Sequence, residues 1–399
     1  MKLVQINAVV RGSTGRIMLQ TAELARENGM EVYTFSRKKP KQPKMDNHFY
    51  FGSFLENLIH RAIAQITGFS ECFSFFSTVS LIIKLKKIKP DIIHLHNLHG
   101  WYINLPLLFR YIKKNNIRTV WTMHDCWSFT GHCPHFDMVG CDKWKTGCGD
   151  CPQYKDYPKS FVDNSRKLFK LKRKWFTGVN DLTIVTPSQW LADLVKQSFL
   201  KDYPVKVINN GINLDIFKPT PSDFRKKYDC ENKYIVLGVA FGWGERKGLD
   251  VFIELSKKLP DNYKIVLVGT NDSVDKLLPD NIISIHRTQN QKELAEIYSA
   301  ADLFVNPTRE ETYPTVNMEA LACGTPILTF RTGGSPEIID ETCGAVVPKN
   351  DIEKLYSELL RISEERPFST EACLERAKGF AAKASIDSCI GLYIENDQE

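Results

Sequence analysis

Two glutamates stand eight residues apart in the stretch EETYPTVNME, at positions 311 and 319. Carboxylates recur at this spacing by chance, and two solvated helix residues are the simplest interpretation of the pair alone. The flanking residues make it more specific. Pro314 is typical of a helix start, and the run CGTP at 323–326 ends that helix before the apolar segment ILTF. The sequence therefore predicts a loop, a short helix and a strand.

A loop before Pro314 allows Glu311 to fold back toward Glu319. On one continuous helix the two carboxylates would lie roughly 12 Å apart, too far to hold one small group. After folding back, the free amides of 315–317 (Thr315, Val316 and Asn317) point at an anion such as a diphosphate. The carboxylates then accept hydrogen bonds from hydroxyl groups on either side, a ribose on one and another sugar on the other. This pattern predicts a nucleotide-sugar site.

Positive charge that complements a diphosphate occurs in the glycine-rich segment FGWGERKG, which follows the apolar run YIVLGVA. Arg246 and Lys247 come just before a predicted helix, so they are placed to meet phosphate groups. For either residue alone, a surface cation is the alternative interpretation. The loop position favours binding.

The N-terminal half offers two further candidates, each in a loop after a predicted strand. Gly12 lies in RGSTGR, where glycine lets the backbone approach a phosphate or sugar; a plain tight turn is the alternative, and the dinucleotide GxGxxG spacing is absent. His124 ends the strand TVWTM, and it is expected to hydrogen-bond or transfer protons near neutral pH. A core histidine is the weaker interpretation, because the polar Asp125 continues the loop.

A cysteine cluster follows, with the spacing C-x7-C-x6-C-x2-C. Its members are Cys133, Cys141, Cys148 and Cys151. The final CGDC resembles the tight pair of structural zinc sites, and in a reducing cytosol zinc is favoured over disulfides. His132 or His135 could replace one of the four sulfurs as a zinc ligand. We expect zinc here to hold an irregular loop and to take no part in catalysis.

Three more histidines, His94, His96 and His99, occur in DIIHLHNLHG. Strand alternation sends the first two to the same face. A metal site needs a third convergent ligand, so we interpret these residues as polar groups at the mouth of a sheet.

These candidates require a scaffold of alternating strands and helices, which predicts an α/β fold with parallel sheets and ligand-binding loops at the strand C-termini. The pattern restarts at Tyr234, after the turn at 209–211. We expect two doubly wound, Rossmann-like domains facing a cleft. They are a first domain at 1–205, with its cysteine-rich loop at 126–152, and a nucleotide-sugar-binding domain at 206–375. A helix at 376–399 is expected to pack back on the first domain.

Composition is that of a soluble globular protein: 399 residues, 43% apolar and 25% charged, with a net charge of +6. The charge suits anionic small substrates or an acidic lipid surface, and no motif points to nucleic acid. The N-terminus is too polar for a signal peptide and no stretch spans a membrane, so we expect a cytoplasmic protein. The basic loop at 37–44 is expected to be solvated. The amphipathic stretch at 68–90 fits either a core-facing helix or peripheral contact with the inner face of an anionic membrane.

Taken together, the chain resembles the retaining GT-B glycosyltransferases of family 4, which transfer sugars from nucleotide sugars. The matching segments are EETYPTVNMEALACGTPIL, TGGSPEII, VINNGINLDIFKP and ERKGLDVF. Within this family, HDCWSFTGHC and the later cysteines resemble a branch acting in exopolysaccharide or lipopolysaccharide assembly. The resemblance implies a nucleoside-diphosphate sugar donor and a glycan or lipid-linked acceptor, which would bind mainly to the domain at 1–205.

The resemblance also assigns roles at matching positions. Glu319 would hold the ribose hydroxyls, Glu311 the donor sugar, the amides of 315–317 the diphosphate, and Lys247 its charge. His124 matches the histidine near the donor sugar, and Gly12 the glycine of the first loop. The family usually has an arginine where this chain has Gly242, and Arg246 is the candidate to replace it.

No DxD-like metal motif occurs in a suitable loop, so we expect catalysis without a divalent cation. A nucleotide-sugar epimerase of the same fold is one alternative, but it needs its own acid and base carboxylates, which we do not find. A degenerate transferase that only binds is the other; it gains from Gly242 and loses because the four charged or polar candidates Glu311, Glu319, Lys247 and His124 are all present.

Overall fold

The computed structural model describes residues 1–38 and 45–394, so most of the predicted basic loop at 37–44 lies outside the described residues. The chain divides into two compact units, Met1–Ile208 with the chain from Ile386 onward, and Asn209–Ser385. The chain passes from the first unit to the second at the predicted turn, and it returns to the first unit within its last helix, Ala382–Ile394. The functions expected of the two domains stay predictions.

The first unit is built on a seven-stranded sheet in the order β3-β2-β1-β4-β5-β6-β7, with every pairing parallel. Its strands are β1 (Lys2–Asn7), β2 (Glu31–Arg37), β3 (His48–Phe51), β4 (Ile92–Leu95), β5 (Arg118–Thr122), β6 (Leu182–Thr186) and β7 (Val205–Val207). Its helices are α1 (Ser13–Glu27), α2 (Phe54–Thr67), α3 (Phe75–Ile88), α4 (Leu105–Lys114), α5 (Ser165–Phe176), α6 (Gln189–Gln197) and most of α14 (Ala382–Ile394), with the short turns η1 (Trp127–Phe129) and η2 (Lys143–Lys145).

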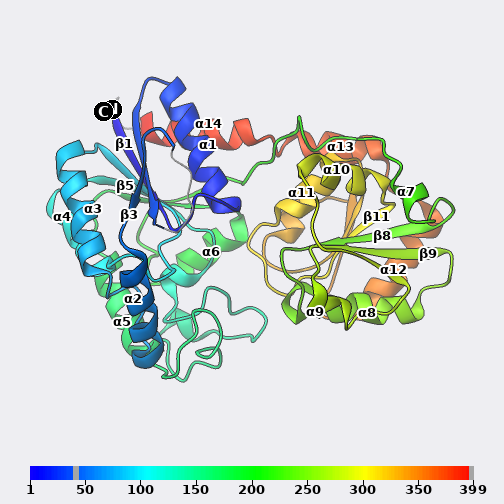
Figure 1. Ribbon diagram of the computed structural model, residues 1–399, viewed down its shortest axis with the longest axis horizontal. Helices are drawn as coiled ribbons and strands as arrows, with labels where there is room; N and C mark the ends of the chain where they lie inside the picture. Colours follow the sequence, from blue (N-terminus) through cyan, green and yellow to red (C-terminus); the bar gives the residue numbers. More distant parts are fainter. Residues whose placement is uncertain (39–44, 395–399) are drawn as a thin grey trace. The chain divides into compact units, whose positions relative to one another are not determined.

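Strand alternation builds two hydrophobic layers on this sheet. Val4, Ile93 and Trp121 face one core, where α3, α4 and α5 pack. The residue that precedes each of these three in the sequence faces the other core, where α1 and α14 pack (Figure 1). Because successive side chains of a strand point to opposite faces, a sheet covered on both sides needs nearly continuous apolar strands, which this sequence supplies.

The second unit repeats the design with a six-stranded parallel sheet in the order β10-β9-β8-β11-β12-β13. Its strands are β8 (Tyr234–Val239), β9 (Tyr263–Val268), β10 (Ile282–Ile285), β11 (Leu303–Asn306), β12 (Ile327–Phe330) and β13 (Gly344–Val347). Its helices are α7 (Phe224–Lys227), α8 (Leu249–Lys258), α9 (Asp272–Asp275), α10 (Gln291–Ala300), α11 (Thr315–Ala322), α12 (Ile352–Glu365) and α13 (Thr370–Lys378), with the turns η3 (Glu245–Lys247) and η4 (Ser335–Glu337). Helices α10, α11 and α13 pack on one face, and α8 and α12 on the other (Figure 1).

Two helix predictions need correction. The stretch at 68–90 becomes helical only at Phe75, because the buried Glu71, at a φ of 59°, turns its carboxylate to the amides of Gly100 and Trp101. The helix expected at 376–399, whose last five residues lie outside the described residues, is interrupted between α13 and α14, where Ile212 exchanges backbone hydrogen bonds with residues 380 and 382.

Helix α2 was not predicted from the sequence, although it carries its own signals. The side chain of Ser53 caps its first turn by accepting from the amide of Glu56 (3.0 Å), and Gly68 ends it at a φ of 70°. Within the described ranges, no helix of either unit has the length and apolarity needed to cross a bilayer.

Candidate active site

The second unit brings two predicted loops together at one sheet edge. Strands β8 and β11 are parallel neighbours, so their following loops start side by side. The amide of Arg309 donates to the carbonyl of Arg246 (2.9 Å), which joins the loops. The buried guanidinium of Arg309 also forms two parallel hydrogen bonds with Asp250 at the start of α8 (2.6 and 2.7 Å). Arg309 was not predicted from the sequence, and its bidentate pairing stiffens this edge.

Lys247 and Glu311, predicted to contact the same donor, contact each other here. The Nζ of Lys247 donates to Oε2 of Glu311 at 2.6 Å, and both side chains are about 20% exposed. The other oxygen of Glu311 accepts from the amide of Thr312 (3.1 Å). Glu311 therefore lies in the loop before α11 as predicted, next to a cation, and its folding back toward Glu319 stays a prediction.

Helix α11 starts beside this pair, at Thr315. Pro314 precedes its first turn, and among the described residues no side chain caps it. Amides in a first turn lack the usual partner four residues earlier, so those of Thr315 and Val316 attract an anion, whereas the amide of Asn317 donates to the carbonyl of Pro314 (3.2 Å). The side chain of Asn317 instead points inward and accepts a hydrogen bond from Asn306 at the end of β11 (2.7 Å). The predicted diphosphate donors at 315–317 thus lie in the expected helix start.

Glu319 lies one turn further along α11 and is only 7% exposed. The hydroxyl of Tyr298, from α10, donates to it at 3.2 Å. Burial, followed by the negative charge of Glu319, raises the pKa of Tyr298 well above its ordinary value, so the hydroxyl stays protonated and able to donate. Tyr298, not identified from the sequence, therefore orients the carboxylate.

The segment TGGSP, at 332–336, packs against the backbone of Glu311 and Thr312. Gly333 has a φ of 53°, and a Cβ atom there would lie 1.7 Å from the carbonyl oxygen of Glu311. The amide of Gly334 donates to the carbonyl of Thr312 (3.1 Å). Only glycine fits at position 333 without moving the backbone of Glu311.

We expect the substitution Gly333→Ala to lower kcat/KM for sugar transfer about 100-fold, because a displacement near 1 Å of a positioning group has that order of effect. Steady-state kinetics, with a thermal melt to verify folding, measure this. Gly391→Ala in α14 is the matched control, since its Cβ would meet no atom within 4 Å. Wild-type kinetics in Gly333→Ala would contradict the positioning role.

Gly12 and His124 lie in the first unit, after β1 and β5. Gly12 precedes α1 with a φ of 85°, and a Cβ atom there would meet no described atom within 4 Å, so its backbone faces open space. Among described residues no side chain caps α1 either. A ligand could therefore approach the backbone of Gly12, whose role in donor binding stays a prediction.

Burial keeps the ring of His124 neutral. Its Nε2 lies 3.4 Å from Nδ1 of His96. Burial lowers the pKa of His124 to about 4, although the nearby Asp125 opposes the shift. Asp125 itself pairs with His99 (2.8 Å); burial raises its pKa, but His99 and the amide of Trp127 bring it down to about 2. At pH 7 the ring of His124 is therefore neutral, which favours hydrogen bonding over proton transfer, the other role expected from the sequence.

The strand histidines are satisfied polar residues of the core. His94 and His96 share a face as expected, with ring centroids 4.1 Å apart. His94 hydrogen-bonds to the hydroxyls of Tyr393 (2.5 Å) and Thr122 (2.7 Å), and His96 to the side-chain amide of Gln5 (2.9 Å). These bonds tie α14 to β4 and occupy the ring nitrogens.

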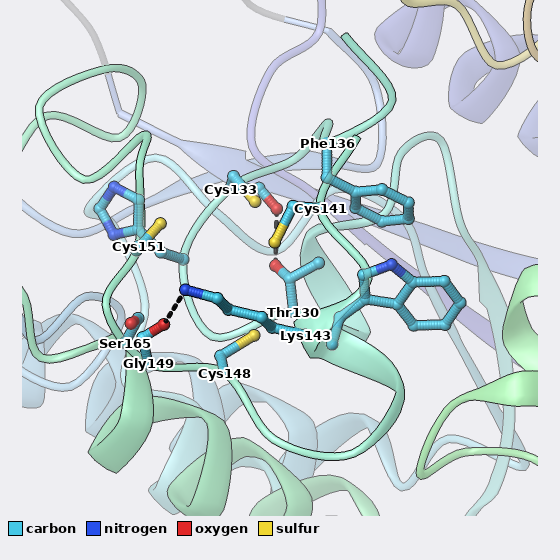
Figure 2. A pocket seen from close by; sticks show the side chains of 11 residues that line it. Thr130, Cys133, Phe136, Cys141, Lys143, Cys148, Gly149, Cys151 and Ser165 are labelled. Carbon is cyan, nitrogen blue, oxygen red and sulfur yellow. Dashed lines mark hydrogen bonds between the residues drawn. The ribbon is translucent and has the colours of Figure 1, made fainter. Parts of the chain in front are cut away.

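The predicted metal residues come together in the first unit. Cys133, Cys141, Cys148 and Cys151 line one small cavity, which His132 also lines (Figure 2). His135 lies in the same loop and does not line this cavity.

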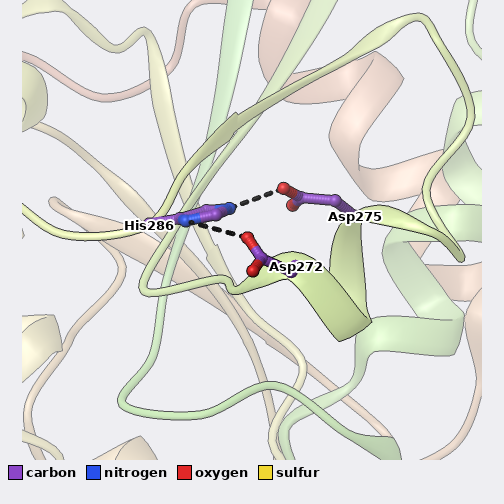
Figure 3. A group of neighbouring side chains, drawn as sticks. All are labelled: Asp272, Asp275 and His286. Atoms are coloured by element: carbon purple, nitrogen blue, oxygen red, sulfur yellow. Dashed lines mark hydrogen bonds and ion pairs between the residues drawn. The ribbon is translucent and has the colours of Figure 1, made fainter.

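A second group of metal-ligating atoms lies in the other unit. Within the described ranges, only Asp272, Asp275 and His286 bring three such atoms within 4.8 Å of one another (Figure 3). All three side chains are exposed, and His286 contacts Asp275 at 2.5 Å. That hydrogen bond raises the pKa of His286. We interpret the group as a surface ion pair.

Comparison with known proteins gives this geometry its context. A family model described as Glycosyltransferase Family 4 matches residues 14–216, just over half of the 399 residues. The chain belongs to glycosyltransferase family 4. A second model, described as Glycosyl transferases group 1, matches residues 232–365 of this glycosyltransferase.

Among curated relatives, WcaC of Escherichia coli K12, named as a colanic acid biosynthesis glycosyl transferase, is 26% identical over 320 residues, covering 78% of this chain and 72% of WcaC. A D-inositol 3-phosphate glycosyltransferase of Mycolicibacterium smegmatis is 24% identical over 204 residues, 47% of each chain.

Solved structures agree on the GT-B fold. The sucrose-phosphate synthase of Thermosynechococcus elongatus superposes with a TM-score of 0.74 at 19% identity, covering 99% of this chain and 98% of that one. HepE of Anabaena, in complex with UDP-glucose, gives 0.68 at 14% identity, covering 99% of each chain.

Proposed function

We propose that this glycosyltransferase moves a sugar, with retention of anomeric configuration, from a nucleoside-diphosphate sugar to a glycan or lipid-linked glycan in surface polysaccharide biosynthesis. The observation that carries the donor class is the grouping of Lys247, Glu311 and the uncapped start of α11 at one sheet edge. The structure of HepE with UDP-glucose and the name of WcaC support the donor and pathway classes.

Each group of the second unit then has one part in donor binding. Lys247 leaves Glu311 to contact the diphosphate, and the amides of 315–317 bind its other oxygens. Glu311, freed from that pair, accepts hydrogen bonds from the hydroxyls of the sugar, and Glu319 from those of the ribose. Arg246 is exposed beside Lys247 and supplies the charge that the glycine at position 242 lacks.

The reaction breaks the bond between the anomeric carbon and the diphosphate oxygen. Negative charge grows on the diphosphate, where Lys247 and the helix start stabilise it. The acceptor hydroxyl forms the new bond to the anomeric carbon on the same face of the sugar, and its proton passes to the leaving phosphate oxygen. His124, as a neutral ring, donates a hydrogen bond to the donor sugar. Because protein groups meet the charge, we expect turnover without added Mg²⁺ or Mn²⁺.

The exposed faces of α2 and α3 fit a lipid-linked acceptor. Their large apolar side chains are 45 to 78% exposed. They are Phe54, Leu55, Leu58, Ile59 and Ile66 on α2, and Phe75, Phe76 and Ile83 on α3. The carboxylate of Glu56 accepts from the amides of Phe76 and Ser77, so the two helix starts adjoin. With Lys86 and Lys87 ending α3, this surface suits the interface of an anionic membrane.

We expect the wild-type protein to sediment with vesicles containing phosphatidylglycerol and the double variant Leu55→Ser/Phe76→Ser to bind at least about tenfold more weakly, since each large apolar side chain contributes roughly 1.5 to 3 kcal/mol on burial. Leu277→Ser, which alters a residue 62% exposed in the other unit, is the control. A wild-type protein that stays in the supernatant would exclude membrane contact.

A thermal-shift screen of nucleoside-diphosphate sugars tests the donor class, and active donors are then tried with lipid-linked acceptors. We expect one nucleotide sugar to raise the melting temperature and NMR of the product to show the donor's anomeric configuration. An inverted product would contradict retention, and no stabilisation by any nucleotide sugar would contradict the donor site.

A further inference from the structure

The loop between β5 and α5 is long and nearly without regular structure, yet it is packed like a core. Its only helical turns in the described chain are η1 and η2. Phe129, Phe136 and Trp144 are nevertheless buried and join the main core of the first unit. The buried Lys172 of α5 donates to the carbonyls of Trp127 (2.7 Å) and Thr130 (3.1 Å). These two hydrogen bonds secure the first turn of the loop, at Trp127–Thr130.

Four cysteines from three parts of the loop surround one cavity of about 20 Å³. Figure 2 shows the side chains of Cys133, Cys141, Cys148 and Cys151 around it; Cys148 and Cys151 are the two ends of the CGDC turn. The Nζ of Lys143 donates to the carbonyls of Gly149 (3.1 Å) and Asp150 (2.8 Å), which fixes that turn. The space is close to that of a single water-sized sphere, so it suits one ion and excludes a larger ligand.

The polar groups around the cavity are arranged for an electron-rich centre. The amide of Gly131 donates to Sγ of Cys148 (3.1 Å), and the amide of Gln153 hydrogen-bonds to Cys151. Backbone amides that point at sulfur stabilise thiolates. His132 lines the same cavity at 5% exposure, and its Nε2 has no hydrogen-bond partner among the described residues. A buried ring nitrogen without a partner, in a residue that lines a cavity with four cysteines, indicates a partner that forms only when the cavity is occupied, such as a thiolate that accepts from the ring N–H.

We propose that Cys133, Cys141, Cys148 and Cys151 bind one structural Zn²⁺ ion, with His132 beside it. Four thiolates give the closed tetrahedral shell of a structural zinc site, which leaves no position open for substrate. The ion would be a crosslink of the loop and would contribute folding free energy to it.

The sulfurs must move closer to bind the ion. Zn–S bonds of 2.3 Å place tetrahedral sulfurs about 3.8 Å apart. In the described chain no three of these sulfurs lie within 4.8 Å of one another, although the thiols of Cys133 and Cys151 already hydrogen-bond. Rotation of cysteine side chains between staggered rotamers supplies such a movement without changing the backbone.

The position of the loop gives the ion an indirect influence on the active site. The loop follows β5 directly after His124 and Asp125. The amide of Trp127 donates to Asp125 (2.9 Å), and the amide of Cys126 donates to the carbonyl of Pro134, next to Cys133 (2.9 Å). A fixed loop therefore keeps Asp125 paired with His99.

Metal analysis of the full-length protein, purified under reducing conditions without chelators, tests the proposal independently of sugar transfer. We expect about one zinc per chain, and Co²⁺ substitution should give the intense visible bands of tetrahedral thiolate coordination. Cys148→Ser and Cys151→Ser should each lose most of the metal, whereas Cys72→Ser, outside the cavity, should keep it. The Co²⁺ spectrum of the wild type remains decisive where a variant fails to fold.

Three outcomes overturn the assignment. The first is well under one zinc per chain with all four thiols titratable. The second is a mass lower by two hydrogens per disulfide, because that pairs the cysteines covalently. The third is loss of zinc in His132→Ala with retention in one cysteine variant, which replaces the four-sulfur set by three sulfurs and a nitrogen.

Discussion

Replacing Lys247 by alanine should lower kcat for sugar transfer by about a thousandfold. The leaving diphosphate gains negative charge in the transition state, and loss of one preorganised donor to such charge costs on the order of 10² to 10³ in rate. Lys247 is held ready by its 2.6 Å contact with Glu311. Removing it also leaves Glu311 without its counter-charge, which makes an anionic ligand harder to accept. Initial rates at saturating donor measure the effect.

Two control variants separate this role from general electrostatics. Lys257→Ala removes an exposed lysine of the neighbouring helix and should leave kcat unchanged. Lys247→Arg keeps the charge but not the compact ammonium, so it should recover part of the rate. Equal kcat values for Lys247→Ala and the wild type would show that Lys247 does not stabilise the transition state.

Replacing Glu319 by alanine should raise KM for the nucleotide sugar about 100-fold with a smaller change in kcat. The carboxylate is predicted to accept hydrogen bonds from two ribose hydroxyls, and hydrogen bonds to a charged group contribute roughly 1.5 to 3 kcal/mol each. Because the ribose is remote from the bond that breaks, most of this loss falls on ground-state binding. Titration calorimetry with the nucleoside diphosphate alone gives the same quantity without turnover.

Tyr298→Phe is the matched test of how Glu319 is oriented. It removes only the hydroxyl that contacts the carboxylate at 3.2 Å, so KM should rise a few-fold. Glu375→Gln, an exposed acid on α13, should have no effect. An unchanged affinity of Glu319→Ala for the nucleoside diphosphate would show that the ribose does not bind at Glu319.

Local patterns sufficed to predict the scaffold of the donor site. Apolar runs followed by glycine-rich loops predicted β8 and the strand at 327–330, and the turn residues before Thr315 predicted the start of α11. These signals are local in sequence, and a parallel sheet converts them into position, because all its strands end at one edge. The α/β class was therefore predictable from local patterns, whereas the GT-B architecture followed from the resemblance of longer segments to a known family.

Contacts between distant residues were not predictable. Arg309 and Asp250 are 59 residues apart, and nothing near either one in the sequence indicates their pairing. Similarly, the need for glycine at position 333 comes from the carbonyl of Glu311, which only the folded chain brings there. Burial is also a property of the fold, which is why the shifted pKa of His124 was missed.

The apolar surface of the first unit shows the same limit. Apolar residues of a helix normally predict a buried face, and sequence patterns alone do not separate a core from a membrane contact. Ile83 and Leu85 are two residues apart in α3, yet the first is half exposed and the second fully buried. Only the packing of α3 against the sheet distinguishes them.

The most direct test of the central claim is to measure, in one reaction, the nucleoside diphosphate released and the glycosylated acceptor formed. We predict equal amounts of both from the wild type and nearly none from Lys247→Ala or Glu319→Ala at donor concentrations near the wild-type KM. Full activity in both variants, or conversion of the donor to an isomer without acceptor, would contradict a donor site built from Lys247, Glu311, Glu319 and the start of α11.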